Sequence, residues 1–110
     1  MIRFEERFMK AILDGTKTMT VRLDNKRRVG EIEAVVVDYN DDEPAAWIQY
    51  TDKRPEQLNH VDVSHEGFTH VNDLVLYLES VYGRERVYAS MPVWQYTFKV
   101  VPEPEIKEEP

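Results

Sequence analysis

The chain of 110 residues contains no cysteine. This absence excludes disulfide bonds, thiolate metal sites and a cysteine nucleophile, and it fits a reducing compartment. Long apolar runs are also missing, since no segment approaches the roughly 20 residues that a helix needs to span a bilayer. Residues 1–6 already include two acids and lack the apolar stretch of a signal peptide. We therefore expect a cytoplasmic protein with no membrane partner.

Acidic charge dominates the chain, but positive charge gathers at its start. The composition is that of one globular domain, with 42% hydrophobic and 32% charged residues and a net charge of −7. Residues 1–30 hold eight Lys or Arg and four acids, a net charge of +4, whereas the remainder holds six and 17, a net charge of −11. An acidic remainder weakens extended contact with a nucleic-acid duplex. The balance favours a small or short anionic ligand in one basic pocket.

Hydrophobic periodicity predicts a few elements that do not alternate regularly, which indicates an α+β fold. We expect a small mixed sheet or barrel covered by two helices. The expected helices cover residues 5–13 and 70–82, and the expected strands cover residues 2–4, 18–23, 31–39, 45–52 and 93–101. Gly15 and Gly83 follow the two helices, and Thr69 is the expected N-cap of the second. Residues 53–56 should break the strand before them, and the acidic, proline-rich residues 102–110 should be disordered.

Alternation along the last expected strand predicts its buried face. Trp94, Tyr96, Phe98 and Val100 should point inward, while the polar residues between them should point outward. We therefore expect this strand to be half-buried, with one face packed on the core.

The segment that organises the chain is Gly-Thr-Lys-Thr-Met-Thr-Val-Arg at residues 15–22. In a strand, alternation sends Thr18, Thr20 and Arg22 to one face and the apolar residues between them to the other. Lys17 lies at the preceding turn and can reach over the edge of the polar face. This pattern is typical of a half-buried strand at the rim of a polar cleft. An ordinary edge strand with solvent-facing Lys and Thr is the alternative.

Two possible metal sites lack the required ligand pattern. Residues 38–49 have calcium-loop spacing at three positions, but Glu43 and Gln49 stand where that loop needs glycine and glutamate. The three histidines lie five residues apart, so they do not share one helix face. We expect no metal and no cofactor.

Several features together resemble the ASCH domain family. The Gly-x-Lys-Thr-x-Thr-x-Arg segment follows a helix, a Gly-Glu pair at residues 30–31 opens the next strand, and His-Glu-Gly-Phe at residues 65–68 precedes the second helix. The resemblance covers residues 4–101 and implies a PUA-like fold, a small mixed β-barrel flanked by two main helices. It thus implies one domain over residues 1–101, with residues 102–110 outside it.

Small stand-alone bacterial members of that family hydrolyse N4-acetylcytidine to cytidine and acetate. Their functional Lys, Thr, Arg and Glu match Lys17, Thr20, Arg22 and Glu66 of this sequence. The resemblance therefore implies that Lys17, Thr20 and Glu66 are catalytic and that Arg22 binds the ligand. The match at Glu66 is the weakest of the four, because little similarity lies between it and Arg22.

This residue set suits amide hydrolysis, which needs a nucleophile, a base and a group that holds the oxyanion. Thr20 offers a hydroxyl, and Arg22 offers a cation. Lys17 can act as base only if its pKa falls from about 10.4 towards 7–8. A carboxylate beside Lys17 would instead raise that pKa, so we assign Glu66 to the cytosine amine and to the leaving-group proton.

The alternative is a binding module for short single-stranded RNA, because other members of the family look like RNA-binding modules. Thr18, Arg22, Lys26, Arg27 and Arg28 are the candidate ligand-binding residues. An aromatic residue such as Tyr50, Phe68 or Trp94 could then stack on a base. Steep salt dependence would distinguish RNA binding from turnover of a neutral nucleoside. An adaptor without a ligand is a third reading, and in each case we expect a monomer or weak homodimer.

Overall fold

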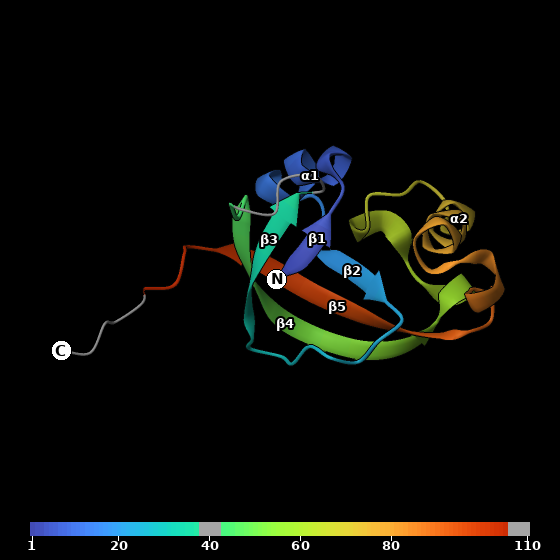
Figure 1. The fold of residues 1–110 in the computed structure, drawn as a ribbon. Coiled ribbons are helices and arrows are strands. Elements are labelled where there is room, and N and C mark those ends of the chain that lie inside the picture. The colour runs from blue at the N-terminus through green and yellow to red at the C-terminus, as the bar shows by residue number, and fades with distance from the viewer. Residues whose placement is uncertain (38–42, 106–110) are drawn as a thin grey trace.

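The fold is built on a single curled sheet. The computed structural model describes residues 1–37 and 43–105. The five strands are β1 (Ile2–Phe4), β2 (Met19–Arg22), β3 (Ile32–Val37), β4 (Ala46–Gln57) and β5 (Pro92–Val101). They lie in the order β1-β3-β4-β5-β2, and only the β1–β3 pair is parallel. The sheet curls into an open half-barrel, with β1 and β2 at its two edges (Figure 1).

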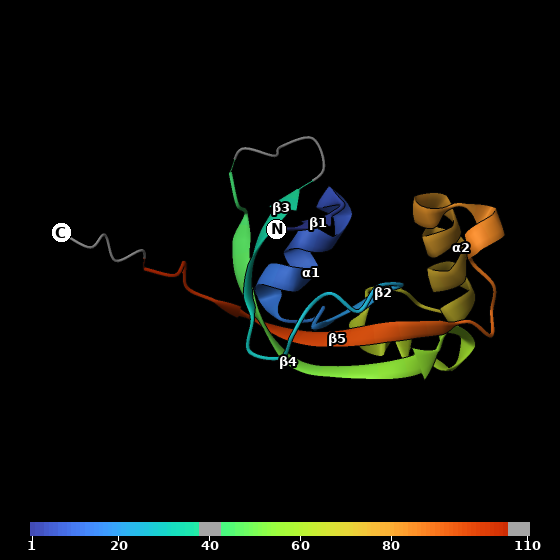
Figure 2. The same cartoon turned by 60° about the horizontal axis from the view of Figure 1, so that its bottom comes forward.

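Two helices lie against this sheet, which confirms the expected α+β class (Figure 2). A 3₁₀ turn, Glu6–Phe8, runs into α1 (Met9–Asp14), and Phe8 and Ile12 are buried there. Gly15 ends α1 in the left-handed conformation, with φ of 84°, as a C-capping glycine does. Gly15 thereby fixes the direction in which the chain leaves α1 and enters β2, so the end of α1 positions residues 15–22.

The second helix, α2 (Val71–Tyr82), begins one residue later than expected. Its N-cap is His70, which makes no capping side-chain hydrogen bond, so the assignment of Thr69 as the N-cap was wrong. Leu74 and Leu78, four residues apart, are buried on one face of this helix, as the helical period predicts. In the described part of the chain, no helix has the length and apolar character needed to cross a bilayer.

Strand β4 continues where the sequence predicted a break. Residues 53–56 pair with β5 up to Gln57, and Pro55 lies opposite Trp94. A register shift between Tyr50 and Asp52 marks the point beyond which β4 pairs with β5 alone. Proline has no N–H to give, and it is tolerated in a strand whose other side is an open edge. The break was predicted because local composition does not reveal which strands lack a second neighbour.

Strand β5 is covered on both faces over much of its length, which the alternation alone did not predict. Tyr96 and Phe98 are buried as expected, but Val93 and Gln95 of the other face are buried too. Val93 joins a second core beneath α2, separate from the core that contains Tyr96. Val100 was predicted to point inward and is 44% exposed, because the strand leaves both cores there.

Parts of several predictions fall outside the described residues. The third strand was expected to reach residue 39, and the following turn and the calcium-like spacing include residues 38–42. Residues 102–105 form no helix or strand, and the predicted disordered tail continues into residues 106–110. The division into a domain and a tail therefore stays a prediction.

Candidate functional site

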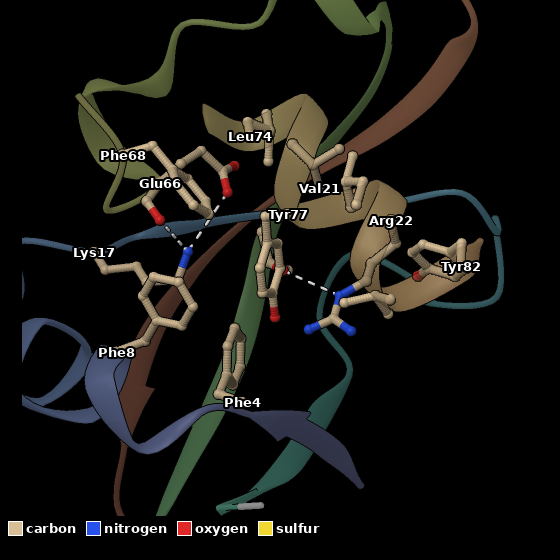
Figure 3. Close-up of a pocket in the computed structure, with 13 residues that line it drawn as sticks. Phe4, Phe8, Lys17, Val21, Arg22, Glu66, Phe68, Leu74, Tyr77 and Tyr82 are labelled. Atoms are coloured by element: carbon tan, nitrogen blue, oxygen red, sulfur yellow. Dashed lines mark hydrogen bonds and ion pairs between the residues drawn. The ribbon is translucent and has the colours of Figure 1, made fainter. Parts of the chain in front are cut away.

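A narrow cleft lies where the two sheet edges face α2. Its walls come from β1, the α1 region, β2, the turn before α2, and α2 itself (Figure 3). The empty space is about 380 Å³ including the part open to solvent, but the part that the side chains enclose is too small for a nucleoside. A nucleoside therefore fits only if lining side chains move.

Lys17 and Glu66 form a buried pair in this cleft. Nζ of Lys17 lies 3.5 Å from Oε2 of Glu66, and the side chains are 3% and 2% exposed. The same nitrogen donates to the backbone oxygens of Glu66 at 2.5 Å and Met19 at 2.9 Å. The rings of Phe4 and Phe8 lie 5.6 and 5.0 Å from it. The Nζ atom of Lys17 therefore faces three oxygen acceptors and is otherwise flanked by aromatic rings.

Burial shifts both members of the pair towards their neutral forms. It lowers the pKa of Lys17, and although Glu66 opposes this change, burial outweighs it. Burial likewise raises the pKa of Glu66 against the effect of Lys17. Glu66 therefore acts to raise the pKa of Lys17, as the sequence predicted, but burial lowers this pKa by more. Among the described residues, Oε1 of Glu66 is buried without a hydrogen-bond partner. The backbone N–H of Val21 favours the charged carboxylate and so opposes the rise in the pKa of Glu66.

Thr20 and Arg22 occupy the same cleft from β2. Thr20 is buried, and its Oγ accepts a hydrogen bond of 3.1 Å from Nε of Arg22. Because the oxygen is the acceptor here, its own proton remains available to a base. Nη2 of Arg22 donates to the backbone oxygen of Arg3 at 3.3 Å, and the guanidinium lies 5.2 Å from the ring centre of Phe4. Arg22 thus bridges the two sheet edges and orients Thr20.

Thr18 does not line this cleft. It precedes β2 and borders a separate hollow beside Gly15 and Phe98, and its backbone oxygen accepts from the N–H of Phe98 at 2.8 Å. The alternation predicted from sequence therefore begins only at the strand itself, at Met19.

The basic loop after β2 also lies outside the cleft lining. Lys26 and Arg28 are exposed, whereas Arg27 is half-buried and donates to Oε1 of Glu33 at 2.8 Å. Asp24 lies 3.5 Å from the same guanidinium. The charge of Arg27 is therefore neutralised locally, which weakens the idea of a continuous basic strip.

Of the three candidate stacking residues, one lines the cleft and two lie elsewhere. Phe68 is half-buried and lines the cleft. Tyr50 is fully buried, and its hydroxyl donates to Glu33 at 2.5 Å. Trp94 is half-buried with Nζ of Lys53 5.0 Å from the centre of its ring. Only Phe68 among these three borders the candidate site.

Sequence reasoning missed an aromatic wall, formed by Phe8, Phe68 and Tyr77. The three ring centres lie 5.4 to 5.7 Å apart. Gly67 lets the chain turn here with φ of 90°, and a Cβ at this position would come 3.2 Å from the Phe8 ring. In the sequence, Phe8 lies four residues before the apolar Ile12, and Tyr77 lies three residues after the apolar Leu74. These helical spacings were the only signal available.

Metal ligands are not grouped in the described residues. No set of three or more His, Cys, Asp or Glu side chains there is arranged to hold an ion.

Solved structures share the fold of this chain. This chain has the PUA-like fold of ASCH domains. A solved ASCH domain from Lactobacillus crispatus superposes with a TM-score of 0.68 at 21% identity, over 84% of this chain and 69% of that one. A mutant ASCH protein from Zymomonas mobilis gives 0.66 at 14%, over 89% and 66%.

A third solved structure widens the comparison. A protein of family DUF984 from Enterococcus faecalis superposes with a TM-score of 0.74 at 18% identity, over 86% of this chain and 67% of that one. The chain thus spans about two thirds of the length of each of these three proteins. No protein-family model matches the sequence, and no curated protein matches it significantly. At these identities the likeness establishes the fold.

Proposed function

We propose that this protein hydrolyses the amide of an N-acylated nucleobase, with N4-acetylcytidine as the representative substrate. The observation that supports the proposal is the buried Lys17–Glu66 pair, which shares one cleft with Thr20 and Arg22. A base, an acid, a hydroxyl and a cation are the groups that amide hydrolysis needs.

Lys17 supplies the base in this proposal. Moving a proton from its ammonium to the carboxylate of Glu66 leaves the total charge of the pair unchanged. Burial favours the resulting neutral pair, since desolvation penalises the charged forms. The neutral amine then accepts the proton of the Thr20 hydroxyl.

Thr20 supplies the nucleophile. Its Oγ forms a bond to the acyl carbonyl carbon, and the carbonyl oxygen takes the negative charge of the tetrahedral intermediate. Arg22, which already donates to Thr20, is the nearby cation that stabilises this charge. The intermediate collapses as the carbon–nitrogen bond breaks.

Glu66 supplies the acid. Its carboxyl gives a proton to N4 as cytidine leaves, and an acyl ester of Thr20 remains. A water molecule then attacks the ester and loses its proton to the carboxylate of Glu66. Lys17 returns its proton to the Thr20 oxygen as the bond between that oxygen and the acyl carbon breaks. Acetic acid departs and ionises in solution, which restores the starting state.

The direct test is incubation of the purified protein with N4-acetylcytidine and chromatographic detection of cytidine and acetate. We expect turnover that disappears in Lys17→Met, Thr20→Val and Glu66→Gln. The matched controls Lys99→Met, Thr51→Val and Glu103→Gln change exposed residues and should keep the activity. Circular dichroism checks the folding of each variant. Full activity of folded Thr20→Val would eliminate the covalent route, and no turnover by the unmodified protein would refute the proposal.

RNA binding is the alternative outcome of the same experiment. If turnover is absent, a fluorescence titration with short single-stranded RNA over a salt series follows. A steep loss of affinity with salt would indicate phosphate contacts. Arg27 should contribute little, because Glu33 and Asp24 already neutralise it.

A further inference from the structure

The aromatic wall joins the two helical parts of the molecule. Phe8 comes from the 3₁₀ turn before α1, Phe68 from the turn after Glu66, and Tyr77 from α2. The guanidinium carbon of Arg7 lies 4.5, 5.8 and 5.3 Å from the centres of the Phe8, Phe68 and Tyr77 rings. Cation–π contacts of this kind add to the attraction between the rings. The wall is therefore a packed unit.

This wall separates two hollows. The cleft with Lys17 and Glu66 lies on one side, and Phe68 and Tyr77 line it. The same two side chains also line an open groove on the other side, which has about 820 Å³ of empty space including the part open to solvent. Two side chains thus stand between the cleft and a much roomier surface groove.

The cleft has a closed end and an open end. At the closed end Lys17 and Glu66 are almost fully buried beside Phe8 and Phe68, whereas at the open end Arg22 is half-exposed (Figure 3). Val81, which borders the cleft, is 52% exposed. A ribose carries hydroxyl groups that are costly to bury without partners. In the proposed pose the sugar therefore lies at the open end and the acyl carbonyl oxygen faces Arg22, so that the alkyl end of the acyl group points towards the closed, aromatic end.

We propose that Phe68 and Tyr77 limit the length of the acyl group, so that the substrates are short-chain N-acyl nucleosides of the acetyl class. This inference rests on the proposed amide hydrolysis. In this proposal the side chains that move to admit the nucleoside lie outside the packed wall, so that an acetyl methyl lies against the wall whereas a longer chain collides with it. Truncating either ring opens a path into the groove behind the wall, where the additional carbons have room.

The test compares kcat/KM for N4-acetyl-, N4-butyryl- and N4-hexanoylcytidine. A hydrophobic pocket discriminates against a misfitting methylene by about tenfold or more, so the unmodified protein should favour acetyl over butyryl by at least that factor. Phe68→Ala and Tyr77→Ala should each raise the butyryl-to-acetyl ratio at least about tenfold. Tyr77→Phe keeps the ring, and Tyr88→Ala removes an exposed aromatic outside the wall; both should leave the ratio unchanged.

The ratio is measured within one variant, so a general loss of active protein cancels. Phe68→Val serves if Phe68→Ala does not fold. Equal cleavage of acetyl and hexanoyl substrates by the unmodified protein would overturn the inference and leave the proposed function intact. An unchanged ratio in folded wall variants would do the same. Failure to cleave any of the three substrates would instead refute the proposed function and the inference together.

Discussion

The ammonium nitrogen of Lys17 lies 3.5 Å from a carboxylate oxygen of Glu66, a residue 49 positions further along the chain. Both side chains are almost fully buried. A buried pair of this kind leaves an uncompensated polar or charged group if only one partner is removed. The stability and the chemistry of the cleft therefore depend on the same contact.

Removing either partner of the Lys17–Glu66 pair alone should strongly destabilise the protein. We expect Lys17→Met and Glu66→Gln each to lower the free energy of unfolding at pH 7 by about 3–5 kcal/mol. The double variant should lose less than the sum, with a coupling of about 0.5–3 kcal/mol. Urea denaturation of the four proteins measures this cycle. Strictly additive losses would show that the two groups do not interact energetically.

The pair also predicts the pH dependence of activity. In the competent state, Lys17 and Glu66 share one titratable proton. Binding of a second proton at low pH, or loss of the shared proton at high pH, should therefore abolish turnover. Burial raises the pKa of Glu66 and lowers the pKa of Lys17. The bell-shaped kcat/KM profile should therefore be narrower than the span between the ordinary values of about 4.3 and 10.4. A rate that stays constant across that span would contradict this assignment.

Gly67 supports the aromatic wall, and Gly30 provides a matched comparison. Both have φ near 90°, but an added Cβ would come 3.2 Å from the Phe8 ring at Gly67 and would meet nothing within 4 Å at Gly30. Gly30→Ala should cost about 1–3 kcal/mol of stability from backbone strain alone. Gly67→Ala should cost more and should also displace Phe8, and with it reduce turnover. Thermal unfolding and kcat/KM give the two readouts, and equal losses at both positions would argue against the contact.

Glu33 should contribute to stability against acid. Burial by itself would raise the pKa of Glu33, but hydrogen bonds from Tyr50 and Arg27 outweigh it and leave the pKa below its ordinary value. A carboxyl whose pKa is lower in the folded state binds fewer protons there than in the unfolded state. Its contribution is therefore complete above the unfolded pKa of about 4.3 and is lost as the pH falls through the folded pKa.

The measurement is chemical denaturation of the unmodified protein and Glu33→Gln between pH 7 and pH 2. The variant should be less stable at pH 7, and the difference between the two proteins should shrink as the pH falls below about 4. Glu103→Gln, an exposed change, is the control. A difference that stays constant over this range would show that ionisation of Glu33 has no part in the stability.

Much of the fold could be predicted because its signals are local. The apolar spacing of residues 5–13 predicts one buried helix face, on which Phe8 and Ile12 lie, and Gly15 ends that helix in the left-handed conformation. The β-strand pattern after it placed Thr20 and Arg22 together. Prediction failed at Pro55, because whether a strand tolerates proline depends on its neighbour and not on its own residues.

The sequence by itself determined the α+β class and the grouping of Lys17, Thr20 and Arg22, since six consecutive positions and their alternation suffice for that. Only the tertiary structure brought Glu66 against Lys17 and separated Arg27 from the cleft by pairing it with Glu33. It also placed Phe68 and Tyr77 between the cleft and the groove. Periodicity specifies which side of an element is apolar. Burial, ion pairing and the shape of a cleft depend instead on segments that meet only when the whole chain packs.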